Sequence, residues 1–150
     1  ICVAESDFVP VWEQLLKADA TPAGFEALEV MRIHGGVPSY PKEFGPHSVP
    51  LEVDGMNGIS EGKGCYPGQE TIERTLALSK PKRTLVAVES ATPLSEGTLT
   101  DENGKTAGEL TSVALGPDGR CIGLALIKHQ AADDPQWLRD GSAVQKRMKD

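Results

Sequence analysis

The chain lacks the features that would place it among membrane, disulfide-rich or self-contained metal proteins. The chain has 150 residues, and none of its apolar runs is as long as the about 18 residues that a membrane-spanning helix needs. Three cysteines are present, and no two form a Cys-x-x-Cys pair. This spacing argues against a disulfide framework and against a zinc or iron–sulfur site built by this chain alone. Three histidines also show no metal-ligand spacing, and we expect them to be surface or structural residues: His34, His47 and His129.

The charge balance is acidic, with a formal net charge of −7. A surface of this sign argues against general binding of polyphosphates, and it provides no strong signal for nucleic acid. The composition is typical of a soluble intracellular protein. We therefore expect a cytoplasmic protein, or one of the mitochondrial matrix if the source is eukaryotic, with no membrane partner.

The most informative segment is residues 62–74, which reads Gly-Lys-Gly-Cys-Tyr-Pro-Gly-Gln-Glu-Thr-Ile-Glu-Arg. Pro67 suits the first position of a helix, because its missing N–H would be an unpaired donor there. Cys65 would then lie near the positive end of a helix and two residues from Lys63. Both influences favour a thiolate over a thiol, so the segment predicts a reactive cysteine.

Other interpretations of this segment are open. A glycine-rich loop before a helix is common, and a lone cysteine is most often a small buried apolar residue. A phosphate-binding P-loop needs Gly, four residues, Gly-Lys and then Ser or Thr. Asn57 stands where the first Gly should be, and Gly64 follows Lys63, so the P-loop is excluded.

Residues before about position 80 show a mostly helical pattern with long loops. A cap at Ser6 or Asp7 predicts a first helix that runs to about Ala18 with one apolar stripe. Thr21-Pro22 predicts the start of a second helix, which stops at two glycines, Gly35 and Gly36. Residues 37–51 contain four prolines, so we expect an ordered loop that forms a wall of a ligand cleft or simply covers the core.

The pattern changes near Ser79-Lys80-Pro81-Lys82, and strands follow. Alternating or β-branched runs predict five short strands, at residues 84–89, 98–100, 106–114, 121–127 and 142–147. Residues 101–104 and 116–119 have the composition of tight turns. Such strands predict a small antiparallel β-barrel, with Cys121 in its core and Trp137 anchoring a linker before the last strand. The fold class predicted for the whole chain is α+β.

Several of these residues together resemble the YgfZ family. The run Lys63-Gly64-Cys65-Tyr66, then Gly68-Gln69-Glu70 and Arg74, is similar to the signature of that family. Residues 32–38 with Tyr40, and the step Pro50-Leu51-Glu52, resemble flanking stretches upstream. Residues 108–112 and 123–126 resemble two strands of a C-terminal barrel. The resemblance spans nearly the whole chain.

The resemblance implies a folate-binding protein related in fold to the aminomethyltransferase (T-protein) of glycine cleavage. The family includes mitochondrial proteins that help to mature [4Fe-4S] enzymes. Residues 1–79 would be the C-terminal part of the folate-binding domain, a helical and loop segment, and residues 80–150 the C-terminal β-barrel. Such proteins are longer than this chain, which opens on Ile1, so we expect part of a longer protein with an incomplete folate site.

The resemblance also implies roles for single residues. Tetrahydrofolate is the expected cofactor, with Lys63, Tyr66, Gln69, Glu70 and Arg74 as its binding residues, although Gln69 and Glu70 could instead cap the helix. Cys65 is the expected functional thiol, with Lys63 beside it. It could act as a transient ligand, a redox partner or a one-carbon acceptor. The expected partners are folate and iron–sulfur client or assembly proteins.

Two rival functions follow from the same residues. The first is a true aminomethyltransferase of glycine cleavage, although that branch does not typically carry the Lys-Gly-Cys-Tyr run. A folate-dependent demethylase or a tRNA-modifying enzyme is a weaker enzymatic alternative. The second rival is a non-catalytic scaffold in which the barrel binds a client protein and the signature is structural.

Overall fold

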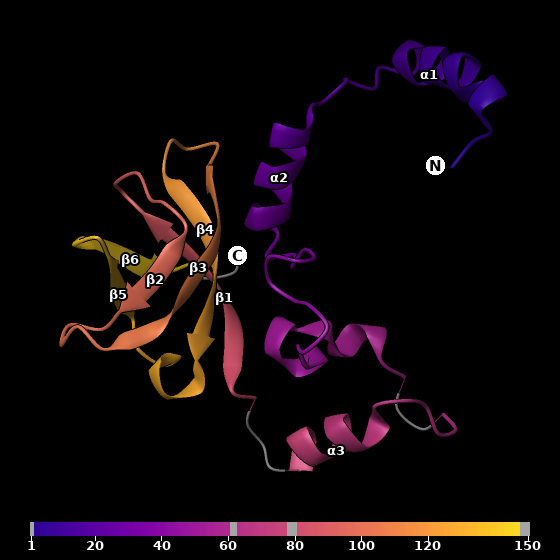
Figure 1. The fold of residues 1–150 in the computed structure, drawn as a ribbon. Helices are drawn as coiled ribbons and strands as arrows, with labels where there is room; N and C mark the ends of the chain where they lie inside the picture. The colour runs from indigo at the N-terminus through magenta and orange to yellow at the C-terminus, as the bar shows by residue number, and fades with distance from the viewer. Residues whose placement is uncertain (1, 61–62, 78–80, 148–150) are drawn as a thin grey trace.

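A computed structural model describes residues 2–60, 63–77 and 81–147, and it shows a helical part followed by a β-barrel (Figure 1). The helices are α1 (Phe8–Lys17), α2 (Phe25–His34) and α3 (Gln69–Ala77). Short 3-10 turns include η2 (Pro50–Val53) and η3 (Gly55–Gly58), which lie between α2 and α3 in the chain. The α+β class predicted from the sequence is confirmed.

The start of α1 agrees with the sequence prediction, whereas the start of α2 does not. Helix α1 follows Asp7 as expected, although the Asp7 side chain makes no capping hydrogen bond to the helix. The predicted start of α2 at Thr21-Pro22 is wrong, because the helix begins at Phe25 with Gly24 as an extended N-cap. Glycine inside a helix is unfavourable by about 1 kcal/mol relative to alanine, so the helix starts after Gly24 rather than before it. Gly35 and Gly36 end α2 as predicted.

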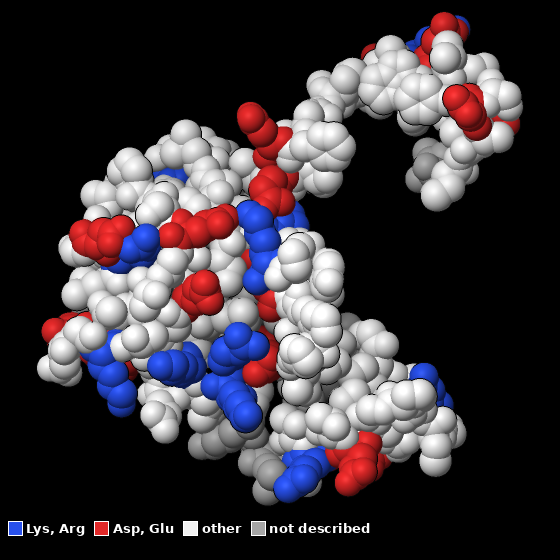
Figure 2. Space-filling view, viewed as in Figure 1, with Lys and Arg blue, Asp and Glu red and all other residues white. Residues whose placement is uncertain are grey.

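The apolar stripe of α1 is present, but it remains exposed. Figures 1 and 2 show this helix standing away from the barrel at the end of an extended segment. The Phe8 and Trp12 rings stack on each other with centroids 6.1 Å apart. The exposed apolar residues of the helix are Phe8, Val9, Trp12, Leu15 and Leu16.

Six strands close the barrel in the described part of the chain. They are β1 (Arg83–Ser90), β2 (Gly97–Thr100), β3 (Thr106–Leu115), β4 (Cys121–Lys128), β5 (Gln136–Arg139) and β6 (Ser142–Lys146). Their order around the barrel is β1-β4-β3-β2-β5-β6, and every pair is antiparallel. Both predicted turns are confirmed, with Gly104 and Gly119 in left-handed backbone conformations (φ 78° and 80°).

The prediction of five strands was wrong because β5 was taken for a linker. Trp137 lies inside β5, is 1% exposed, and belongs to the barrel core. Its indole N–H donates to the carbonyl of Ala131 at 3.1 Å. A two-residue turn, Asp140-Gly141, joins β5 to β6, and both residues have positive φ. Asp-Gly is a characteristic hairpin turn, so the sequence did contain a signal for this strand.

The inside of the barrel holds the main apolar core, which includes Val88, Leu99, Leu110, Ile127 and Val144. Cys121 is 8% exposed in β4, which confirms its prediction as a core residue. A smaller cluster of Ile33, Ile122 and Leu124 packs α2 against the outside of the barrel. Hydrophobic contact therefore fastens the second helix to the sheet.

The predicted domain boundary at residues 79 and 80 lies outside the described residues. On either side of it, α3 ends at Ala77 and β1 begins at Arg83. The division into residues 1–79 and 80–150 remains a prediction.

Candidate functional site

The signature segment lies in a loop that leads into α3. Gly62 lies outside the described residues, and Lys63, Cys65 and Tyr66 precede the helix. Pro67 is not the first helical residue as predicted, because Gly68 has a φ of 88° and the helix begins at Gln69. The Gly68 carbonyl accepts from the N–H of Ile72 at 3.3 Å, so Gly68 serves as the N-cap.

Lys63 and Tyr66 are brought together by this loop. The Lys63 ammonium lies 4.8 Å from the centroid of the Tyr66 ring, which is a cation–π contact. Cys65 lies between them in the chain and is exposed. Among the described residues the structure gives its thiol no hydrogen-bond partner. An exposed thiol, a cation and an aromatic ring are thus displayed on one short loop.

The remaining predicted site residues lie on α3. Gln69 donates from its side-chain amide to the Glu73 carboxylate at 2.6 Å, one helical turn away. Glu70 and Arg74 are exposed. Ile72 is the buried residue of this helix, and the helix contacts η2. The loop and α3 thus place the six predicted residues on one continuous segment, and the assignment of Cys65, Lys63, Tyr66, Gln69, Glu70 and Arg74 to a site remains a prediction.

We predict that iodoacetamide modifies Cys65 faster than Cys121 at neutral pH by about tenfold or more. Cys65 is exposed near the start of α3, whereas Cys121 is buried in β4. A short alkylation pulse followed by mass spectrometry of the folded chain measures both rates. Cys2 is the matched control, because it is also exposed but lies far from the signature in the sequence. Labelling of Cys65 no faster than Cys2 would show that exposure alone, and not Lys63 or the helix start, governs its reactivity.

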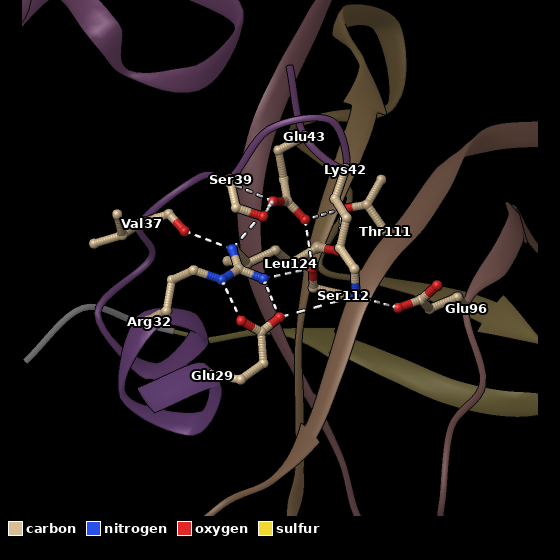
Figure 3. Close-up of polar contacts among 10 residues, drawn as sticks. All are labelled: Glu29, Arg32, Val37, Ser39, Lys42, Glu43, Glu96, Thr111, Ser112 and Leu124. Carbon is tan, nitrogen blue, oxygen red and sulfur yellow. Dashed lines mark hydrogen bonds and ion pairs between the residues drawn. The ribbon is translucent and has the colours of Figure 1, made fainter. Parts of the chain in front are cut away.

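A second polar cluster, which the sequence did not predict, joins α2 and the following loop to the barrel (Figure 3). Its centre is Glu43, whose side chain is buried at 1% exposure. Glu43 Oε1 accepts from the hydroxyls of Ser112 and Thr111 at 2.5 and 2.8 Å. Glu43 Oε2 accepts from the Ser39 N–H at 2.8 Å and from Arg32 Nη1 at 3.1 Å. We call these residues, with Glu29, the Glu43 cluster.

Arg32 is the cation of the Glu43 cluster. Its Nε and Nη2 donate to the two oxygens of Glu29 at 2.8 and 2.5 Å, which is a bidentate pair. Nη1 also donates to the Val37 carbonyl at 2.7 Å, and Nη2 donates to the Ser112 hydroxyl at 2.7 Å. Arg32 therefore links the last turns of α2 to the proline-rich loop and to β3.

The electrostatics of the cluster keep both carboxylates ionised. Burial would raise the pKa of Glu43, but hydrogen bonds from Ser112, Ser39 and Thr111 and the charge of Arg32 together lower it below its usual value. The hydrogen bond from Arg32 lowers the pKa of Glu29, and the same bond raises the pKa of Arg32. The cluster is thus a satisfied charge network in which Glu43 is buried and Glu29 is partly exposed.

The Pro50-Leu51-Glu52 step also links the segment before α3 to the barrel by an ion pair. Glu52 is buried in η2, and its Oε2 lies 3.0 Å from Arg83 Nη2 at the start of β1. Glu43 therefore fastens the middle of the proline-rich loop to β3, and Glu52, the residue just after the loop, fastens its end to β1. The loop thus contacts the barrel, and whether it also forms a wall of a ligand cleft stays a prediction.

Two negative findings apply to the described residues only. No three or more His, Cys, Asp or Glu side chains gather there in a way that could hold a metal ion. In the same ranges, no helix has the length and apolar character needed to cross a membrane.

Comparison with known proteins shows which proteins this chain is similar to. No family model matches the chain. A chloroplastic protein of Arabidopsis thaliana, whose name suggests a transferase, is 39% identical over 125 residues, which cover 83% of this chain and 29% of that protein. The tRNA-modifying protein YgfZ of Colwellia psychrerythraea is 33% identical over 65% of this chain and 33% of its own length. The aminomethyltransferase of Deinococcus deserti is 28% identical over 89% of this chain and 36% of its own length.

The chain is similar in sequence to YgfZ proteins and, at lower identity, to aminomethyltransferases. Its fold matches the crystal structure of the glycine cleavage aminomethyltransferase T of Bartonella henselae with a TM-score of 0.79, over 93% of this chain and 42% of that one. The sequence identity there is 17%, so this likeness concerns the fold. The chain spans about a third of the length of the relatives it matches. The resemblance to YgfZ that the signature indicated is confirmed.

Proposed function

We propose that this chain is part of a tetrahydrofolate-binding accessory protein that supports the assembly or repair of [4Fe-4S] enzymes. The observation that carries the proposal is the exposed signature loop, in which Cys65 lies between Lys63 and Tyr66 at the start of α3. Relatives named YgfZ and aminomethyltransferase support the same fold and family.

The chemistry of folate matches the groups on this segment. Its flat pterin packs well against an aromatic ring, and its anionic glutamate tail requires a cation. Tyr66 and Lys63 are held together by their cation–π contact, and Arg74 is an exposed cation on the adjoining helix. Gln69 and Glu70 can add directional hydrogen bonds. An exposed thiol beside these groups can serve as a transient ligand, a redox partner or a one-carbon acceptor.

An aminomethyltransferase of glycine cleavage is the second candidate. It is favoured by the relative in Deinococcus deserti and by the match to the fold of the Bartonella henselae enzyme. Lys63-Gly64-Cys65-Tyr66 weighs against it, since we do not expect that run in the aminomethyltransferase branch. The YgfZ relatives are named tRNA-modifying proteins, so modification of tRNA is a third candidate function of the same site.

Calorimetric titration with tetrahydrofolate tests the ligand directly. We expect the full-length protein to bind it and the 150-residue chain to bind it far more weakly, because the site requires parts of the longer fold. The test variant is Lys63→Ala in the full-length protein, which should weaken tetrahydrofolate binding by about tenfold through loss of one charged contact. Equal affinity of the two chains would place the whole site within residues 1–150. Failure of the full-length protein to bind would remove folate from the proposal.

A further inference from the structure

We propose that a cavity between the end of α2 and the barrel binds a small ligand through an oxyanion, either a carboxylate or a phosphate, with Arg147 as its anchoring cation. The cavity has a volume of about 720 Å³, which is within the range of small-molecule sites. None of its lining residues belongs to the signature segment, residues 63–74.

Five parts of the fold contribute walls to this cavity. The end of α2 provides His34 and two glycines, and β1 provides Ala87 and Glu89. Ile122 of β4, which is buried, and Ala87 give the cavity an apolar patch. The turn between β3 and β4 provides Asp118, and the end of β6 and the residue after it provide two cations, Lys146 and Arg147. A ligand with a short apolar portion and one anionic group would suit this lining.

Arg147 is held in place by two contacts that leave part of its guanidinium unused. Its backbone N–H donates to the Ala87 carbonyl at 2.9 Å, which fixes the residue beside β1. Its Nη2 donates to the carbonyl of His34 at the end of α2. Its Nη1 is buried and has no hydrogen-bond partner among the described residues. A buried donor of a charged group without an acceptor is unfavourable, so a ligand oxygen in this place would be stabilised.

The acidic residues of the cavity do not supply that acceptor, because another arginine already binds them. Arg120 Nη1 donates to Glu89 Oε1 at 2.9 Å. The backbone N–H of Arg120 donates to Asp118 Oδ1 at 3.1 Å, and Arg120 Nε lies 3.8 Å from Asp118 Oδ2. Both carboxylates therefore share Arg120 as a cation, and among the described residues neither is paired with Arg147, which is left to bind an anion from outside.

The test is a nuclear magnetic resonance titration of the ¹⁵N-labelled 150-residue chain with sodium acetate and with sodium phosphate, against sodium chloride at equal ionic strength. We expect saturable shifts of the amides of Gly35, Gly36 and Arg147. Tighter binding of acetate would identify a carboxylate ligand, tighter binding of phosphate would identify a phosphate ligand, and equal binding would support the shared oxyanion. Shifts no larger than those with chloride, or saturable shifts confined to other residues, would overturn the proposal.

Two variants separate the site from general effects of charge. Arg147→Gln keeps a donor for the His34 carbonyl but removes the charge, and we expect at least tenfold weaker binding. Arg139→Gln is the control, because Arg139 lies in β5 and donates to the carbonyls of Ser95 and Glu96, away from the cavity lining. This variant should bind as the unaltered chain does. Ala87→Leu leaves Arg147 in place and narrows the cavity from the β1 wall, so it decides the question if Arg147→Gln does not fold. Unchanged binding in both Arg147→Gln and Ala87→Leu would exclude this cavity.

Discussion

Replacement of Glu43 by Ala is expected to lower the free energy of unfolding by about 3–5 kcal/mol, which is typical for removal of one partner of a buried ion pair. The variant would leave Arg32 Nη1 and the hydroxyls of Ser112 and Thr111 without their shared acceptor. Each of these donors would then lie in a region from which Glu43, at 1% exposure, excludes water. Chemical denaturation followed by circular dichroism measures the loss.

Glu96→Ala is the matched control for this prediction. Glu96 also accepts from a cation, Lys42, at 2.8 Å, but both side chains are exposed. An exposed pair contributes at most about 1 kcal/mol, so this variant should be nearly as stable as the unaltered chain. If Glu43→Ala costs no more than Glu96→Ala, the Glu43 cluster does not stabilise the fold.

The stabilisation from the cluster should also depend on pH in one direction. The folded-state pKa values of Glu43 and Glu29 are lowered, so their contribution is fully present above the pKa of an unfolded glutamate, about 4.3. It is lost as the pH falls through the lower folded-state values. The difference in stability between the unaltered chain and Glu43→Gln should therefore shrink below about pH 4. A difference that stays constant between neutral and strongly acidic pH would show that the charge of Glu43 is not what stabilises the fold.

Replacement of Cys65 or Lys63 by Ala in the full-length protein is expected to lower the activity of [4Fe-4S] enzymes in cells severalfold while folding remains intact. Both residues lie in an exposed loop, where a side chain contributes little packing energy. We expect the change in free energy of unfolding to stay within about 0.5–1 kcal/mol, the range of an exposed cation–π contact or less. Thermal melting, an assay of a [4Fe-4S] enzyme and glycine catabolism in one strain test this together.

Cys2→Ala and Lys105→Ala are the controls, because they remove the same types of exposed side chain elsewhere in the chain. Normal glycine cleavage with defective cluster enzymes would support the accessory function. Normal cluster enzymes with defective glycine cleavage would favour the aminomethyltransferase. A large drop in melting temperature of the Cys65 or Lys63 variant would mean that the signature is structural.

Prediction from the sequence worked best where the signal is local. Alternation of apolar and polar residues identified β1 and β6, and two tight turns, one of them Asp101 to Gly104 between β2 and β3, located the strands that flank them. In that turn the Asp101 carboxylate accepts from the N–H groups of Asn103 and Lys105 at 2.9 and 2.8 Å, a contact between near neighbours. The starts of α2 and α3 were misplaced by two or three residues, because a proline that fits a first helical turn is followed in each case by a glycine that does not.

Among the candidate site residues, too, the sequence identified the group that is local in the chain and missed the group that is not. The signature residues from Lys63 to Arg74 lie within twelve positions, so sequence alone was enough to group them. The Glu43 cluster was missed although Arg32 had been singled out for its resemblance. Arg32 reaches Ser112 and Glu43 reaches Thr111 across 80 and 68 positions in the chain. Nothing in the local pattern shows which glutamate will be buried against which hydroxyl.

What the sequence determined by itself is therefore the type and order of the three helices and of five of the six strands that the structure describes, the tight turns and the continuous signature loop. These depend on backbone preferences and side-chain periods that operate over a few residues. Only the tertiary structure decided that β5 pairs with β2 to close the barrel, that Glu43 becomes a buried acceptor, and that Arg147 Nη1 has no acceptor among the described residues. The physical reason is that burial, and the hydrogen-bond partners it requires, depend on which distant segments pack together.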